Sequence, residues 1–171
     1  GTVFNKKELL VLLQDFHCLT GLRSAVFDSY GIEVLAYPPE LPAYCRLIRS
    51  VLMARPAVTC VTSGLPQGNA AKADDHLPLP CGLIEVVTPV QIDGAVVGFL
   101  LLSHIVQGAD EQSEWSLRKN AARLTQLKNG TAKSYNALPR TPYPVLKSAA
   151  DLLALAAAAL YQKGLTRLAA G

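Results

Sequence analysis

The apolar residues of this chain are most concentrated in residues 81–106, where two runs of β-branched and aliphatic residues flank a turn signal. Residues 83–90 and 95–105 predict two strands, and Asp93-Gly94 predicts the hairpin turn between them. Neither run alternates cleanly between apolar and polar residues. We therefore expect a central hairpin with both faces covered, one by helices and the other by a ligand or a partner.

Helical spacing of apolar residues recurs towards both ends of the chain. Asn5 and Glu8 resemble a capping box, and Leu and Phe residues then follow at helical spacing up to Gly21, which predicts an amphipathic first helix. Pro144 opens an Ala- and Leu-rich segment over residues 145–168, which predicts a long last helix. This helix either covers the sheet or dimerises and relays a signal, and the sequence leaves both readings open. Further helices are expected over residues 43–53, with Arg46 and Arg49 pointing outward, and over residues 113–130 and 131–137.

The segments between these helices predict a second hairpin and a long loop. Residues 24–28 and 32–36 predict two short strands around the turn Ser29-Tyr30-Gly31. Gly and Pro interrupt residues 54–80, so we expect a mostly irregular segment there with a short helix near Ala70. Long irregular segments are often lids or binding loops. The polar run Asp74-Asp75-His76 within it suggests metal ligands, but such a run in a loop is more often solvated.

Length and composition fit one folded domain. The chain has 171 residues, of which 50% are hydrophobic and 17% charged, so we expect a single domain over residues 1–171 and exclude a disordered chain. A net charge of +3 without a dense Lys and Arg stripe predicts no direct contact with nucleic acid. The longest candidate for a membrane span, residues 95–106, contains Ser103 and His104 and is better interpreted as a strand. With no leader visible, a cytoplasmic protein without membrane contact is expected, and Gly1 in place of Met indicates an excised fragment or a tag remnant.

The candidate chemistry is sparse. The sequence has no glycine-rich phosphate loop, nucleophile elbow or zinc-protease motif, so we expect neither an enzyme nor a cofactor. Cys18, Cys45, Cys60 and Cys81 have no close spacing and are expected to be mainly buried thiols. If the fold brought Cys45, Cys60 and Cys81 together, the alternative function would be a cysteine-based metal or redox sensor.

Several local strings follow one another in a characteristic order. They are Tyr44-Cys45-Arg46-Leu47-Ile48-Arg49, then Cys60, Cys81-Gly82-Leu83, Thr88-Pro89-Val90 with Asp93-Gly94 and Gly98, and finally residues 135–139 before the last helix. With these strings, and over nearly its whole length, the chain resembles the PocR sensory domain family, a variant of the PAS fold.

This resemblance implies an α/β (α+β) fold, namely a PAS-like antiparallel sheet flanked by helices, with long N- and C-terminal helices. It also implies a ligand-sensing module without catalysis. Such modules are usually joined to an AraC-type helix-turn-helix domain or to a signalling kinase, an output domain that we expect outside these residues. The implied ligands are small hydrocarbon derivatives such as propanediol.

A sensor for a small diol needs an apolar pocket with a few fixed hydrogen-bonding groups, because burying a hydroxyl without a partner costs roughly 1–3 kcal/mol. Glu85 can accept bonds from two hydroxyls, and strand alternation places it on one face with Val87, unless it faces solvent or pairs with an arginine. By the same rule Ser103 and His104 point to opposite faces, so we do not expect them to line one pocket. The expected ligand-binding residues are Phe27, Tyr44, Cys45, Ile48, Cys81, Glu85, Val87, Leu101 and Ser103. We expect propanediol or glycerol as the ligand and a homodimer formed through the terminal helices, with a ligand-free dimerisation module as another alternative.

Overall fold

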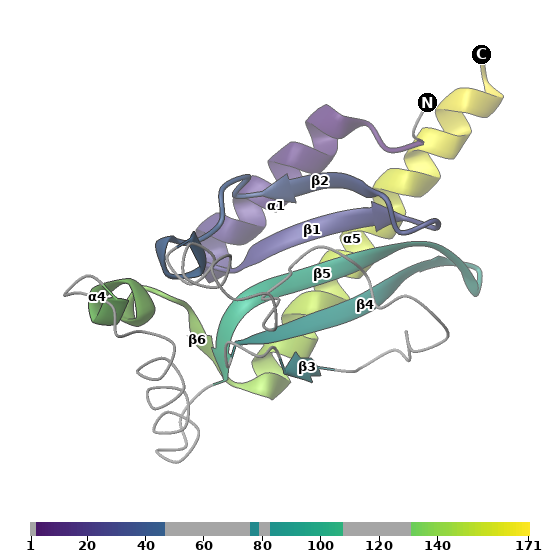
Figure 1. Cartoon of the computed structure of the whole chain (residues 1–171). Helices are drawn as coiled ribbons and strands as arrows, with labels where there is room; N and C mark the ends of the chain where they lie inside the picture. Colours follow the sequence, from purple (N-terminus) through teal and green to yellow (C-terminus); the bar gives the residue numbers. More distant parts are fainter. Residues whose placement is uncertain (1–2, 47–75, 79–82, 108–130) are drawn as a thin grey trace.

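The computed structural model describes residues 3–46, 76–78, 83–107 and 131–171, and its centre is an antiparallel sheet (Figure 1). The sheet consists of β1 (Arg23–Asp28), β2 (Glu33–Tyr37), β3 (His76–Pro78), β4 (Ile84–Ile92) and β5 (Ala95–Gln107), and its spatial order is β2-β1-β5-β4-β3. The N-terminal hairpin thus lies beside the predicted central hairpin. This arrangement is a PAS-like α+β fold, as the sequence predicted.

Both hairpins turn at the expected residues. Asp93 and Gly94 join β4 to β5 with positive φ angles of 49° and 81°, the backbone that a tight hairpin turn requires. Between β1 and β2, Asp28 Oδ1 accepts hydrogen bonds of 2.9 Å from the backbone N–H groups of Tyr30 and Ile32. The short polar side chain of Asp28 therefore fixes the first turn, while Asp93-Gly94 fixes the second.

Helix α1 (Lys6–Thr20) has Asn5 as its N-cap and Gly21 as its C-cap, as predicted. Asn5 Oδ1 accepts hydrogen bonds from the backbone N–H groups of Lys7 and Glu8, and Gly21 closes the helix with a φ of 70°. The capping box is nevertheless only half formed. The Glu8 carboxylate accepts hydrogen bonds from Lys163 at 2.6 Å and Arg167 at 3.0 Å, which ties α1 to the last helix.

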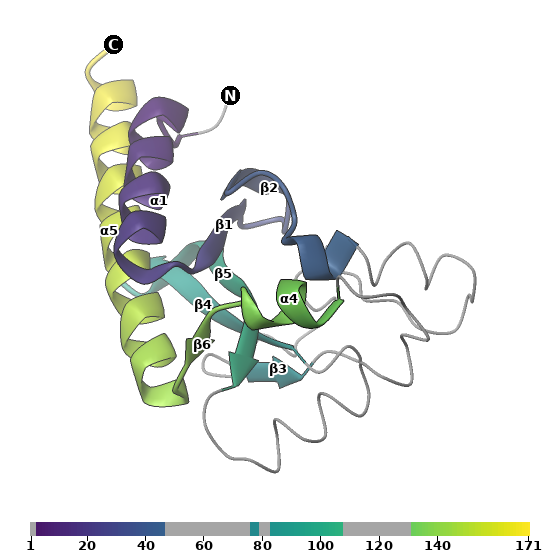
Figure 2. The ribbon, with the colours of Figure 1, turned by 90° about the vertical axis from the view of Figure 1, so that its left-hand side faces the viewer.

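The last helix, α5 (Tyr143–Ala169), lies beside α1 on the same face of the sheet (Figure 2). Pro144 stands in its first turn as predicted, and the short α4 (Thr131–Asn136) precedes it. By length and composition alone, α5 is the one helix of the described chain that is long and apolar enough to cross a membrane. Residues 95–106, the longest apolar run considered in the sequence, form β5, which confirms their interpretation as a strand. The residues of α5 that pack inward are Leu146, Ala150, Leu153, Ala154, Ala157 and Gly164.

The sheet has a hydrophobic cluster on each face. On the first face, Val26, Val86 and Leu102 pack with Leu9 and Leu13 of α1 and with the buried residues of α5. On the second face, Ala25, Phe27, Val87 and Leu101 form a separate buried cluster. This explains why the strands of the central hairpin do not alternate between apolar and polar residues. The two helices cover the first face, as predicted.

Some predictions were wrong and others fall outside the described residues. The strand β3 was expected to be irregular chain, and β6 (Arg140–Thr141), which pairs in parallel with the end of β5, was not predicted. Cys18 is exposed rather than buried. Residues 43–46 are helical, whereas the rest of the helix predicted over 43–53, the helix near Ala70 and the helix over 113–130 lie outside the described residues.

Candidate functional site

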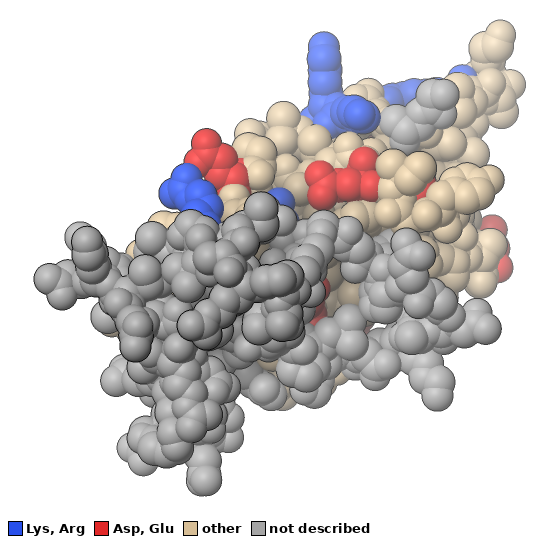
Figure 3. Space-filling view, viewed as in Figure 1, with Lys and Arg blue, Asp and Glu red and all other residues tan. Residues whose placement is uncertain are grey.

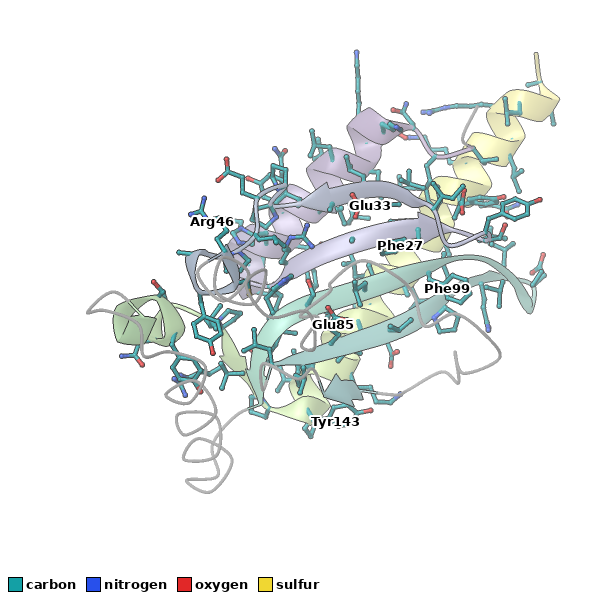
Figure 4. All side chains as sticks on the ribbon, viewed as in Figure 1. Phe27, Glu33, Arg46, Glu85, Phe99 and Tyr143 are labelled. Atoms are coloured by element: carbon teal, nitrogen blue, oxygen red, sulfur yellow. The ribbon has the colours of Figure 1, made fainter. Side chains whose placement is uncertain are left out.

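The second face of the sheet presents an apolar floor on three adjacent strands. Ala25 of β1 pairs with Leu101 of β5, which pairs with Val87 of β4, so their side chains lie side by side. Phe27 and Phe99 form the next cross-strand pair, and Figure 4 shows both projecting from this face with Glu85. The fold thus brings together Phe27, Val87 and Leu101, three of the expected wall residues.

Glu85 is a buried carboxyl group on this floor. It is only 6% exposed, so the alternative in which it faces solvent is wrong. Its Oε1 has no hydrogen-bond partner among the described residues. Loss of hydration raises the pKa of Glu85 to about 7, and the positive charge of Arg23 acts in the opposite direction. Near neutral pH the group can therefore donate a hydrogen bond as well as accept one.

Arg23 is the cation of this site, and sequence reasoning missed it. It opens β1 directly across from Ser103 of β5. Its Nε donates a 3.0 Å hydrogen bond to the Pro38 carbonyl oxygen, which fixes the guanidinium. Burial lowers the pKa of Arg23, while the charges of Glu33, Glu85 and Cys45 raise it. The only sequence signal was a charged residue at the start of an otherwise apolar strand.

A β-bulge places two polar residues opposite Glu85. Ile84 pairs with Ile105 and Val86 with Leu102, so Ser103 and His104 together face the single residue between Ile84 and Val86. His104 has a left-handed φ of 63°, and its Nδ1 lies 2.7 Å from Ser103 Oγ. Both side chains are 1% exposed. The prediction that these two residues cannot line one pocket is therefore wrong, because the bulge breaks the strand alternation on which it depended.

Tyr44 and Cys45 lie in the helical turn of residues 43–46 and are both buried. The Tyr44 ring packs edge-on against Tyr135, with centroids 5.4 Å apart, and the Arg140 guanidinium lies 5.0 Å from the Tyr135 ring centroid. These contacts hold α4 against the turn at the end of the sheet where β5 finishes. In its ionised form Cys45 would raise the pKa of Arg23, so the thiol lies near the same cation.

A cavity of about 230 Å³ lies beyond Arg23, between the end of α1 and the bulge. Its floor includes Ser103 and His104, and Glu85 is not among the described residues that line it. The cavity therefore adjoins the apolar floor without containing its carboxyl group. It is lined by His17, Gly21, Arg23, Pro38, Glu40, Pro42, Ser103, His104, Ala137, Leu138 and Pro139.

Three of the candidate residues are not placed. Ile48, Cys60 and Cys81 lie outside the described residues, so the three-cysteine sensor stays a prediction. Within the described ranges, no group of three His, Cys, Asp or Glu side chains is arranged to hold a metal ion. The described part of this side of the molecule carries both acidic and basic side chains, without a continuous basic band (Figure 3).

Comparison with known proteins gives one match. The model of a family described as the sensory domain found in PocR matches residues 2–165. Searches of curated proteins and of solved structures found no match. The family is one of sensory domains and not of enzymes, and its model covers all the strands described above.

Proposed function

Because the chain belongs to the family of sensory domains found in PocR, we propose that it senses a small hydroxylated molecule such as propanediol or glycerol, bound over the second face of the sheet. The observation that carries this proposal is the buried Glu85 carboxyl, whose Oε1 lacks a partner among the described residues. A buried polar atom without a partner costs free energy, and a ligand hydroxyl recovers that loss.

The surroundings of Glu85 favour a neutral ligand with an apolar part. Phe27, Val87 and Leu101 form a dry floor beside the carboxyl, and a hydrocarbon chain lying on this floor is removed from water. A carboxyl with a pKa of about 7 exchanges hydrogen bonds with a hydroxyl in either protonation state. The apolar floor carries no charge of its own, so a charged ligand lying on it would lose hydration that only Arg23, at the edge of the floor, could offset for an anion.

In this proposal, ligand binding changes the activity of an attached DNA-binding or kinase domain in the cytoplasm. Binding over β4 and β5 shifts the equilibrium between two positions of the helices that pack on the opposite face of the same strands. The buried residues of α5 contact β4 and β5 directly, so a change in the twist of these strands reaches α5 without an intermediate element.

The partner of the terminal helices, in the same proposal, is a second copy of this chain. Val145, Leu152 and Leu155 of α5 are 54%, 69% and 69% exposed, and Ala159 is exposed beside them. These residues follow the heptad repeat of a two-stranded coiled coil. Residues 145, 152 and 159 occupy position a of successive heptads, and residue 155 occupies position d. We call these four residues the α5 seam.

A thermal-shift screen tests the proposed ligand class. The purified domain is heated with small diols, glycerol, short-chain alcohols and aldehydes, and a ligand that binds the folded state raises the melting temperature with its concentration. We expect a diol or glycerol to do so for the wild type and for Glu33→Ala, which removes an exposed carboxylate on the neighbouring strand β2, but not for Glu85→Ala, which removes both hydrogen-bonding oxygens. A flat response to every hydroxylated compound would contradict the proposal.

A further inference from the structure

The cavity beyond Arg23 has the features of a second binding site. Five separate segments build it: the end of α1, the start of β1, residues 38–42, the bulge of β5 and residues 137–139. Its volume of about 230 Å³ is smaller than the roughly 300–1,000 Å³ of pockets that take drug-sized ligands. A ligand of a few heavy atoms fits such a space.

Arg23 supplies this cavity with a fixed positive charge. The Nε–H bond to the Pro38 carbonyl oxygen holds the guanidinium plane in place. No carboxylate lies within salt-bridge distance of Arg23 among the described residues, although the side chain is half-buried. A guanidinium anchored through Nε keeps its Nη donors for a planar, two-oxygen acceptor. Desolvation strengthens its attraction for an anion.

The rest of the lining suits the same kind of ligand. Ser103 and His104 offer a buried hydroxyl and imidazole on the floor, and His17 stands half-buried in the last turn of α1. Glu40 is an exposed acidic residue of the lining, and its carboxylate lies 3.5 Å from the Arg46 guanidinium, which offsets part of its charge. His104 keeps a left-handed backbone, and such strained backbone concentrates at binding and catalytic sites.

We propose that this cavity binds a small organic anion, namely a short-chain carboxylate, with its carboxylate group on the Arg23 guanidinium and its short tail against Leu138 and Pro139. The site is additional to the diol site and does not depend on it. An anion here neutralises the charge that acts on Glu85, so occupancy of the cavity favours the neutral form of that carboxyl.

A nuclear magnetic resonance titration of the ¹⁵N-labelled domain with sodium propionate, against sodium chloride at equal ionic strength, tests the site. We expect saturable shifts for the amides of Gly21, Ser103 and His104 and none for Gly94, at the far end of β5. Propionamide, the neutral analogue, should cause no shifts. Saturable shifts of the same amides with inorganic phosphate would also support the site and would assign it to an inorganic anion. No saturable shift with either anion would overturn the proposal.

Two variants connect the binding to the named cation. Arg23→Gln should weaken propionate binding by about tenfold to a hundredfold, as loss of a charged hydrogen-bond donor does. Arg167→Gln, which changes an exposed arginine outside the lining of the cavity, is the matched control and should bind as the wild type. Glu85→Ala should keep propionate binding while losing the response to diols, which separates the failure of one site from that of the other. Undiminished propionate binding by Arg23→Gln would overturn the assignment of the carboxylate group to the Arg23 guanidinium. If that variant does not fold, the titration of the wild type decides whether the cavity binds an anion.

Discussion

At the scale of single residues, the unusual feature is a carboxyl group that the fold buries without a salt bridge to any other described residue. Glu85 stands on a floor of Phe27, Val87 and Leu101, and its pKa of about 7 results mainly from lost hydration. A solvated or salt-bridged glutamate would instead have a pKa at or below the usual value near 4.5. The residue therefore carries a measurable signature of its burial.

Replacement of Glu85 by Gln should change how stability depends on pH. The folded-state pKa is about 7 and the usual value is 4.5, so between these pH values the folded chain keeps a proton that the unfolded chain has released. The neutral carboxyl contributes its whole share of the free energy of unfolding below pH 4.5, and this share is lost as the pH rises through 7. The loss in the free energy of unfolding is on the order of 3 kcal/mol.

Urea denaturation of both proteins at several pH values measures this difference. The wild type should lose stability relative to Glu85→Gln as the pH rises from 4.5 to 7, and the variant should be the more stable protein at pH 8. Glu33→Gln, in which the removed carboxylate is exposed, is the control and should follow the wild type. Parallel pH profiles for the wild type and Glu85→Gln would contradict the buried, neutral carboxyl.

Gly98 is a residue whose lack of a side chain is required by a neighbouring strand. A Cβ atom at this position would collide with the backbone carbonyl oxygen of Phe27. Gly98→Ala should therefore lower the free energy of unfolding by about 1–3 kcal/mol, as overpacking does, in a chemical denaturation experiment. Val96→Ala, a change at a partly exposed position of the same strand, should cost much less. Equal costs would show that the strands separate there without penalty.

The sequence predicted the identity of several site residues but not their geometry. Phe27, Val87 and Glu85 share a face because strand alternation holds in β1 and in β4, whereas the bulge lies in β5. Ser103 and His104 do not follow the alternation, because a bulge inserts one residue and no local residue pattern marked its position. Arg23 was missed because its role depends on its cross-strand pairing and on the Pro38 carbonyl, both of which arise from tertiary structure.

At the scale of elements, strong local signals were reliable and short elements were not. The Asn5 cap, the Gly21 stop and the Asp93-Gly94 turn each impose a backbone conformation, and each predicted an element end correctly. Strand β3 has three residues and β6 has two, so their pairing depends on β4 and β5 rather than on their own sequence. Such strands leave no periodic pattern to detect.

The cap of α1 gives a prediction at this scale. Asn5→Ala removes the side-chain oxygen that accepts from the backbone N–H groups of Lys7 and Glu8, and it should cost about 1 kcal/mol of stability. Thermal or urea unfolding measures the loss. Gln14→Ala, at an exposed position in the middle of the same helix, should change stability much less. A cost for Gln14→Ala equal to that for Asn5→Ala would argue against the cap as the cause.

At the scale of the whole molecule, the sheet separates two kinds of surface. Helices α1 and α5 cover the first face, and Glu8 joins them through Lys163 and Arg167 (Figure 2). The second face carries the buried carboxyl and the apolar floor. The ligand site and the helix pair thus lie on opposite sides of the same strands. In this arrangement a small change in strand twist can shift the helices.

The α5 seam gives a prediction about assembly. Leu152→Glu and Leu155→Glu place a charge on each of two central seam positions, so either variant should shift the protein from dimer to monomer in sedimentation-velocity experiments. Leu168→Glu is the matched control, because Leu168 is 66% exposed on the same helix but lies outside the seam. A wild-type protein that stays monomeric across the concentration range would contradict a seam that pairs two copies.

The central claim is that Glu85 recognises the hydroxyl groups of a small ligand on the second face of the sheet. Isothermal titration calorimetry with propanediol and glycerol tests this most directly, using the wild type, Glu85→Ala and the control Glu33→Ala. We predict saturable binding by the wild type and by Glu33→Ala, and binding at least about tenfold weaker by Glu85→Ala, in line with the loss of a hydrogen bond to a charged or strongly polar group. Equal affinity of the wild type and Glu85→Ala, or no binding by the wild type, would contradict the account.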